Sequence, residues 1–336
     1  MTTQHYSLAS NPDLERLHNA PYRVVIFSAS SYGNSGQIFR GFMQANIQSD
    51  LPLQHTMHTA LGVDRDKIRL VASEILGSEQ LPHVVITIGA SCTQAYVEVA
   101  AEKQVSVPLV YAASAGLGPS LSRSLMPMAP ATGVEIVKGD MEKAARFLWQ
   151  AKPEMKRLLV PYFPGGINGF LDKESTIIKD FFTARGVHVS MLPVYSLAHS
   201  YQLVCQQLSN YDTLMLLEGD LAIERHRAFA YECIRHGVTL FACISEGPTF
   251  GSVLGYAMDF GEVGEKAFEY AQRIAYDGAD PVQLPVITMP DKRVLFGNAS
   301  LLMHQDLSAE AFDGVDKDLA VSMCQPAEVL SYLKRS

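Results

Sequence analysis

The sequence has no uninterrupted apolar run close to the roughly 20 residues that a membrane-spanning helix needs. Residues 1–20 form a polar extension that contains Asp13, Glu15 and Arg16 and lacks an apolar core, so it does not look like a signal peptide. We therefore expect no direct insertion into a membrane and a cytoplasmic location. If a native export signal has been removed from the numbered chain, the expected location is the periplasm, free or anchored as a lipoprotein.

Cysteine is scarce, and its spacing carries no metal or disulfide pattern. The five cysteines are odd in number and form no CxxC pair. Nucleotide-binding, zinc-hydrolase and α/β-hydrolase motifs are also absent, because the chain has no GxxxxGK[ST], no GxGxxG after a strand, no HExxH and no GxSxG. We expect neither a cofactor nor a metal.

Charge of one sign is not concentrated anywhere in the chain. The net charge of −8 is spread without long runs, which argues against a nucleic-acid partner. With 48% apolar and 18% charged residues, the composition is that of a globular protein with a substantial core. The 336 residues exceed the roughly 250–300 at which a single core stops growing, so two lobes are expected.

A repeated pattern is present instead: an apolar strand-like run, a short polar or glycine-containing loop, and then a helix. Val84–Ile88 runs into Gly89–Thr93, and Leu158–Val160 runs into Phe163–Asn168. Such continuous apolar strands alternating with helices are typical of parallel sheets covered on both faces. Ligands of these sheets bind beyond the carboxyl ends of the strands, so the site is sought in those loops.

The pattern divides the chain into two parts. In the first part it predicts strands at 23–27, 84–88 and 108–112, with helices at 36–47, after Asp64, and at 94–103. The segment around His55 and His58 is predicted to be a surface loop. In the second part it predicts strands at 157–162, 187–192, 213–217 and 238–244, with helices at 140–150, 171–185, 198–208 and 222–236.

The end of the chain carries a resemblance to a known family. A glycine-led strand ends in an Asp-aromatic pair and is followed by a glycine, an Ala-rich helix and a Gly-x-x-Pro turn. The residues of this pattern are Gly255, Asp259, Phe260, Gly264, Gly278, Pro281, Val286 and Asn298. Their order resembles the closing signature of ABC-transporter substrate-binding proteins of the tryptophan and aromatic amino-acid type. The resemblance extends over about Arg23 to Leu307.

This resemblance implies the type I periplasmic-binding-protein fold. That fold is α/β, with two doubly wound parallel-sheet lobes joined by three hinge strands and a ligand clamped between the lobes. Carried onto this chain, lobe 1 comprises 21–131 plus 259–288, and lobe 2 comprises 132–258 plus 289–336. The hinges are expected near 131–134, 258–260 and 288–291.

Candidate ligand-binding residues follow strands of the first lobe. They are Ser30, Ser31, Tyr32, Ser91, Cys92, Thr93 and Ser114. The hydroxyls of Ser91 and Thr93, together with free N–H groups at a helix N-terminus, suit a carboxylate or other anion, although ordinary helix capping is the alternative. Tyr32 would stack on a flat ligand or lie exposed in its loop. The family often has Ser-Asp-Pro where this chain has Ser114-Ala115-Gly116, and the missing acid argues against an α-amino-acid ligand.

Further candidates come from the second lobe and the hinge. Asn168 and Gly169 match a family loop that supplies polar contacts, although turn formation alone would also explain them. Asp220 and Glu246 stand at strand ends, where they would replace the missing acid or serve as solvated or capping residues. Asp259 at a hinge strand would contact the ligand or cap the following helix.

The sequence therefore predicts a substrate-binding component of an ABC importer, which clamps a small amino-acid-like or aromatic ligand and delivers it to membrane permease subunits. It is not expected to be an enzyme. A cytoplasmic ligand sensor of the same fold is one alternative. Another is a cofactor-independent enzyme, because Cys92 and Cys243 are reminiscent of the strand-end cysteine pair of aspartate/glutamate racemases.

Overall fold

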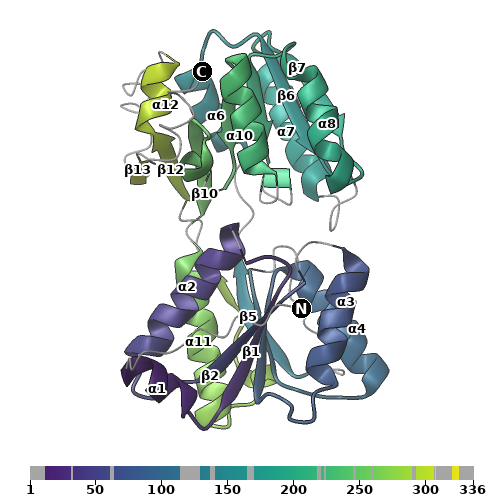
Figure 1. Cartoon of the computed structure of the whole chain (residues 1–336), viewed down its shortest axis with the longest axis vertical. Coiled ribbons are helices and arrows are strands. Elements are labelled where there is room, and N and C mark those ends of the chain that lie inside the picture. The colour runs from purple at the N-terminus through teal and green to yellow at the C-terminus, as the bar shows by residue number, and fades with distance from the viewer. Residues whose placement is uncertain are drawn as a thin grey trace. The chain divides into compact units, whose positions relative to one another are not determined.

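The computed structural model describes residues 12–31, 33–60, 64–113, 129–136, 141–164, 170–217, 221–222, 225–244, 247–258, 260–289, 293–305, 307 and 320–324. The chain divides into two compact units. Unit 1 comprises Met1–Val137 and Phe260–Pro290, and unit 2 comprises Lys138–Asp259 and Asp291–Ser336. Each unit is a sheet with helices on both faces (Figure 1).

Unit 1 contains a six-stranded sheet in the order β11-β5-β4-β3-β1-β2, in which every pair is parallel. Its strands are β1 (Arg23–Ser28), β2 (Gln54–Thr59), β3 (Val84–Ile88), β4 (Leu109–Ala112), β5 (Ala131–Ile136) and β11 (Ile287–Met289). All five residues of β3 are buried, as expected for a parallel strand covered on both faces. Because β5 pairs with β4, it lies in unit 1, whereas the sequence analysis assigned residues from 132 onward to the second lobe.

The helices of unit 1 form two layers. They are α1 (Pro12–His18), α2 (Gly33–Gln48), α3 (Arg65–Leu76), α4 (Ala90–Lys103) and α11 (Gly261–Tyr276), with the short η3 (Pro281–Gln283). Helices α2 and α11 pack together on one face of the sheet, and α3 and α4 pack together on the other (Figure 1). Phe27, Val85 and Leu109 belong to the buried cluster beneath α3 and α4.

Unit 2 contains a seven-stranded sheet in the order β13-β12-β10-β9-β8-β6-β7. Only β10 and β12 pair in the antiparallel sense among these described strands. The strands are β6 (Arg157–Tyr162), β7 (His188–Pro193), β8 (Thr213–Leu216), β9 (Thr239–Ala242), β10 (Leu254–Met258), β12 (Arg293–Asn298) and β13 (Ala320–Cys324).

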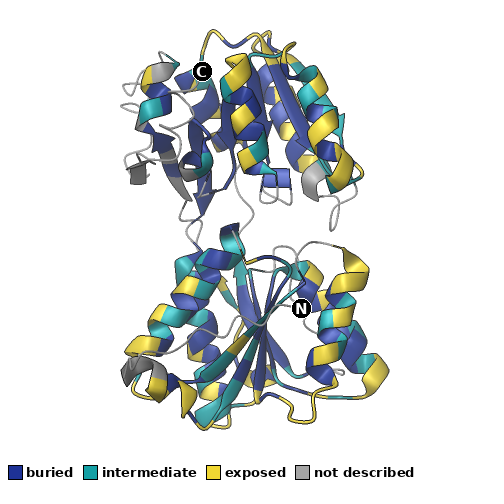
Figure 2. Cartoon of the chain, in the orientation of Figure 1, coloured by how far each residue is buried: buried dark blue, intermediate teal, exposed yellow. Residues whose placement is uncertain are grey.

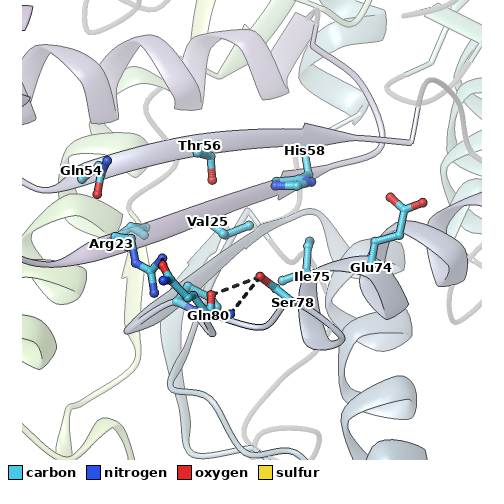
Figure 3. A pocket seen from close by; sticks show the side chains of 11 residues that line it. Arg23, Val25, Gln54, Thr56, His58, Glu74, Ile75, Ser78 and Gln80 are labelled. Carbon is cyan, nitrogen blue, oxygen red and sulfur yellow. Dashed lines mark hydrogen bonds between the residues drawn. The ribbon is translucent and has the colours of Figure 1, made fainter. Parts of the chain in front are cut away.

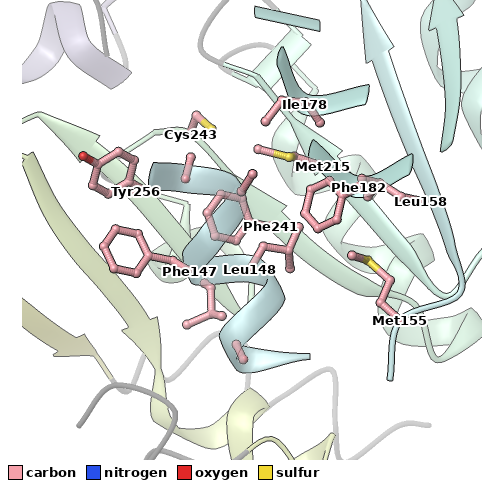
Figure 4. Packing of buried hydrophobic residues seen from close by; sticks show 14 of the residues in the cluster. Phe147, Leu148, Met155, Leu158, Ile178, Phe182, Met215, Phe241, Cys243 and Tyr256 are labelled. Atoms are coloured by element: carbon pink, nitrogen blue, oxygen red, sulfur yellow. The ribbon is translucent and has the colours of Figure 1, made fainter. Parts of the chain in front are cut away.

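The helices of unit 2 also cover both faces of their sheet. They are α6 (Met141–Ala151), α7 (Phe170–Thr183), α8 (Leu197–Leu208), α10 (His226–His236) and α12 (Ala299–His304), with the short η2 (Pro248–Phe250). Under α6 and α7, Phe147 and Phe182 pack with Met215 and Phe241 in a continuous apolar cluster (Figure 4). Figure 2 shows that the strands are largely buried while the outer helix surfaces are exposed.

The predicted α/β architecture of two doubly wound parallel-sheet units is confirmed by this arrangement, with the antiparallel pair β10–β12 as a departure from it. Strand β2 was missed, because its sequence QHTMHT is polar and resembles a loop. It lies at the edge of the sheet, where one side has no partner strand among the described residues, so polar side chains are tolerated. None of the described helices combines the length and the apolar character that a bilayer-spanning segment requires.

Helices α2 and α11 approach each other backbone to backbone. A Cβ atom built on Gly264 would lie 1.9 Å from the carbonyl oxygen of Ile38, and one built on Gly41 would lie 1.9 Å from that of Gly261. Both distances are far below van der Waals contact, so only glycine fits at either position. Next to this contact, the rings of Phe42 and Phe268 pack edge to face with their centroids 5.5 Å apart.

We predict that Gly264→Ala lowers the free energy of unfolding by about 1–3 kcal/mol, because the added methyl group forces the two helices apart. Urea unfolding followed by circular dichroism measures the change. Glu265→Ala, on the same helix and only half-buried, is the matched control and should stay within about 0.5 kcal/mol of the wild type. Equal stability of the two variants would contradict the close contact.

Candidate functional site

Three neighbouring strands of unit 1 end at the same level of the sheet. Ser28 of β1 is in register with Ile88 of β3, which is in register with Ala112 of β4. Helix α2 begins at Gly33, five residues beyond β1, and α4 begins at Ala90, two residues beyond β3. Two helix N-termini therefore lie at one edge of the sheet, which is the edge where ligands of parallel sheets bind.

The loop after β1 is held by its own serine residues. The buried Ser28 hydroxyl donates to the carbonyl oxygen of Ser30 at 2.7 Å and accepts from the Ser30 N–H at 3.3 Å. Ser30 is 9% exposed, whereas Ser31 is exposed. The short turn therefore presents Ser31 to solvent at the entrance to α2.

The turn after β3 is built around Gly89. Its φ of +84° is a conformation that side chains disfavour, and its N–H donates to the carbonyl oxygen of Ala112 at 2.9 Å. As the N-cap of α4, Gly89 supplies no side-chain hydrogen bond. The N–H groups of the first turn of α4 therefore receive no side-chain cap from the N-cap residue, and the exposed Ser91 lies beside them.

Thr93 lies in the same turn but has a structural role. It is fully buried, and its hydroxyl is 2.8 Å from that of Thr87 and donates to the carbonyl oxygen of Gly89 at 2.9 Å. These bonds hold the turn together from the inside. Of the adjacent candidates, the structure exposes Ser91 and buries Thr93.

Cys92 is also fully buried, in the cluster beneath α3 and α4. Burial raises the pKa of its thiol to about 12, and a hydrogen bond with the backbone of Ala29 only partly opposes this. The thiol is therefore protonated at neutral pH, which argues against the thiolate that the racemase alternative requires. Cys243 is buried too, and it belongs to unit 2.

The remaining sequence candidates cannot be placed. Tyr32, Ser114, Asn168, Gly169, Asp220, Glu246 and Asp259 lie outside the residues that the structure describes. Their assignment to a ligand site stays a prediction.

Two residues near this edge were missed by the sequence analysis. Ala113, directly after β4, has a φ of +54°, which is strained for a residue with a side chain, and its N–H donates to the carbonyl oxygen of Val134 at 2.9 Å. Gln37 of α2 accepts a hydrogen bond from the N–H of Phe260 at 3.1 Å. Phe260 begins the segment 260–290, in which the chain returns from unit 2 to unit 1, so this bond holds the start of that returning segment against α2. No local pattern signals either residue, because both depend on contacts between distant segments.

In unit 2, a second group of side chains gathers at the start of α10. The guanidinium carbon of Arg227 lies 4.3 Å from the centre of the Phe250 ring. The ring of His226, whose centroid lies 6.4 Å from that of Phe250, is also buried, and the residue is 1% exposed. Burial is the main cause that lowers the pKa of His226 to about 4, and the backbone of Gly247 acts in the opposite direction to a smaller extent.

The residue Asn298, which belongs to the resemblance pattern, holds the adjacent loop. Its amide nitrogen donates to the carbonyl oxygen of Pro248 at 2.8 Å, and its amide oxygen accepts from the N–H of Leu301 at 3.1 Å. The side chain is fully buried. Asn298 therefore joins η2 to α12 and caps that helix, which gives it a structural role.

No family model matches the chain, and a search of curated proteins finds no match. Solved structures do match. The ABC domain in complex with L-Trp from Streptococcus pneumoniae is 12% identical with a TM-score of 0.72, over 90% of this chain and 100% of that chain. An ABC transporter solute-binding protein from Agrobacterium vitis with bound allitol is 10% identical with a TM-score of 0.55, over 85% and 98%.

A LacI transcriptional regulator from Bacteroides fragilis also matches, at 9% identity and a TM-score of 0.53, over 81% of this chain and 96% of that chain. At these identities the similarity establishes the fold. The chain therefore has the α/β fold of type I periplasmic-binding-protein-like structures, whose solved examples include ABC solute-binding proteins.

We predict that acidification destabilises the protein through His226. Its pKa is about 4 in the folded protein and 6.5 for a solvated histidine, so between these values the unfolded chain binds more protons and stability falls as pH falls. Between pH 7 and 5 the loss from this residue is about 2 kcal/mol. Urea unfolding at both pH values measures it.

In this experiment, the free energy of unfolding of His226→Gln should differ less between pH 7 and pH 5 than that of the wild type. His199→Gln, which replaces an exposed histidine, is the matched control and should keep the wild-type difference. If the difference in free energy of unfolding is the same in His226→Gln as in the wild type, then His226 binds protons equally in the folded and the unfolded state.

Proposed function

We propose that this protein is the solute-binding component of an ABC importer. In this proposal a small organic ligand, amino-acid-like or aromatic, is bound by loops of both units and the loaded protein delivers it to permease subunits. Closure of the units around the ligand would be driven by contacts that only the closed state provides. The observation that carries the proposal is the shared edge in unit 1, with exposed serines beside two helix N-termini, in a fold that solved solute-binding proteins also have.

The chemistry of that edge favours an anionic group on the ligand. Ser91 offers a hydroxyl, and the first turn of α4 offers N–H groups that the N-cap residue Gly89 does not cap. Together they suit a carboxylate, because backbone N–H groups and the helix dipole both favour negative charge there. The two ligand-bearing neighbours contain L-Trp and allitol, which differ widely in chemistry, so the ligand has to be found by a screen.

A ligand sensor of the same fold is the second candidate, favoured by the match to a LacI transcriptional regulator. The racemase alternative is disfavoured by the buried, protonated thiol of Cys92. Co-purification with permease subunits would separate the importer component from the sensor. Turnover of aspartate or glutamate would be needed to support the enzyme.

The first experiment is a thermal-shift screen of the full chain against amino acids, aromatic acids, nucleosides and small sugars. A ligand present at 100 times its dissociation constant stabilises the folded state by about 2.7 kcal/mol, which a melting curve resolves. A selective, saturable shift without chemical change of the ligand supports a binding protein. Absence of any shift, with solvent-deuterium exchange into aspartate or glutamate, would contradict it.

We predict that Ser91→Asp weakens binding of a carboxylate-bearing ligand by roughly tenfold or more, because it places a like charge at the N-terminus of α4. Aspartate is favourable in a first helical turn, so the fold should be retained. Isothermal titration calorimetry with the ligand from the screen measures the change. Asn210→Asp adds the same charge at an exposed position of unit 2 and should bind as the wild type. If both variants lose the same affinity for the ligand, the anionic group of the ligand does not bind at the N-terminus of α4.

A further inference from the structure

A pocket lies in unit 1, at residues other than those of the candidate site. It has a volume of about 490 Å³ and opens between β2 and the last turn of α3 (Figure 3). It begins at Arg23 and Gln54, the first residues of β1 and β2. None of Ser30, Ser31 and Ser91 lines it, so the pocket is distinct from the candidate site. Its volume falls within the range of about 300–1,000 Å³ that is typical of small-molecule sites.

One wall of the pocket is a row of polar side chains on β2. Gln54, Thr56 and His58 alternate with residues of the other face, so all of them face the pocket. None of them makes a side-chain hydrogen bond with another described residue. An amide, a hydroxyl and an imidazole are therefore open to a ligand at intervals of about 6–7 Å along the strand.

The two ends of the pocket carry opposite charges. Arg23 donates to the side-chain oxygen of Gln80 and to the carbonyl oxygen of Leu81, and both partners are uncharged. Glu74 is exposed and makes no ion pair within the described part of the chain. Figure 3 shows Arg23 at the Gln54 end of the row and Glu74 at the His58 end. Among the described residues, therefore, neither the positive charge of Arg23 nor the negative charge of Glu74 has an ion-pair partner, and the two lie at opposite ends of the groove.

The floor between these ends is apolar. Val25 of β1, Ile75 of α3 and Pro82 line it, and Ile75 is 3% exposed. Small aliphatic side chains of a ligand would cover this floor, while its polar atoms would face the row on β2. Burial is the main cause that lowers the pKa of His58, while Glu74 acts in the opposite direction, so the imidazole is mostly neutral at pH 7 and offers one donor and one acceptor.

We propose that this pocket binds a short extended peptide with free termini. The row from Gln54 to His58 spans about 13 Å, the length of about four extended residues. The N-terminal ammonium group pairs with Glu74, and the C-terminal carboxylate lies by Arg23. Peptide N–H and C=O groups bond to the row on β2. A zwitterion of this length matches both end charges at once, which a single cation or anion does not.

The test is calorimetric titration of the full chain with tetra-alanine, N-acetyl-tetra-alanine and tetra-alanine amide. Tetra-alanine should bind saturably, and either blocked peptide should bind roughly 3–10-fold more weakly, since each lacks one terminal charge. Glu74→Gln should weaken tetra-alanine by a similar factor and abolish the preference for a free N-terminus. Glu79→Gln, at an exposed neighbouring position outside the pocket, is the matched control and should bind as the wild type.

Absence of saturable binding of tetra-alanine would overturn the proposal, and so would equal binding by wild type and Glu74→Gln. Ser91→Asp separates this site from the importer ligand site, since it should leave peptide binding unchanged. Glu74→Gln should in turn leave unchanged the melting shift produced by the ligand from the screen. These two variants therefore distinguish failure of the peptide proposal from failure of the importer-ligand proposal.

Discussion

The close contact of α2 with α11 is the constraint on which unit 1 depends. Helix α11 belongs to a segment that returns to unit 1 after the chain has passed through β6 to β10 of unit 2. Gly41 and Gly264 allow the two helix backbones to approach closely. The hydrogen bond from the N–H of Phe260 to Gln37 holds the start of the returning segment against α2. Helix α11 packs with α2 over one face of the sheet. The same returning segment also supplies β11, which forms the edge of the sheet opposite β2. Local interactions alone would not complete this unit.

Because helices cover both faces of the sheet, they limit where polar side chains of the strands can reach solvent. Where strands are buried on both faces, polar groups are available only at their ends and at the sheet edge. At the carboxyl ends, the turn at Gly89 directs the Thr93 hydroxyl inward and leaves Ser91 outside. At the edge, β2 carries the row of polar side chains that lines the pocket between β2 and α3. The two candidate sites of unit 1 thus arise from one architecture, at different boundaries of the same sheet.

Much of the fold could be predicted from the sequence where strands are apolar and loops are short. Strand β3 and strand β6 have the boundaries expected from their apolar runs. Helix α4 begins at Ala90, earlier than the expected 94, because the positive φ of Gly89 turns the chain directly into the helix. The predicted surface loop around His55 and His58 was wrong, because these residues lie in the edge strand β2, whose position at the edge allows a polar sequence.

By itself, the sequence determined the fold class, because alternating apolar runs and helices bury their faces only in a layered α/β arrangement. It also identified the loops after β1 and β3 as candidate site segments. Only the tertiary structure decided which side chains of those loops reach solvent, since Ser91 is exposed on α4 while the next two residues, Cys92 and Thr93, are buried. It alone brought Arg23, Gln54 and Glu74 around one pocket, because residues distant in the chain share a site only after β1, β2 and α3 have packed.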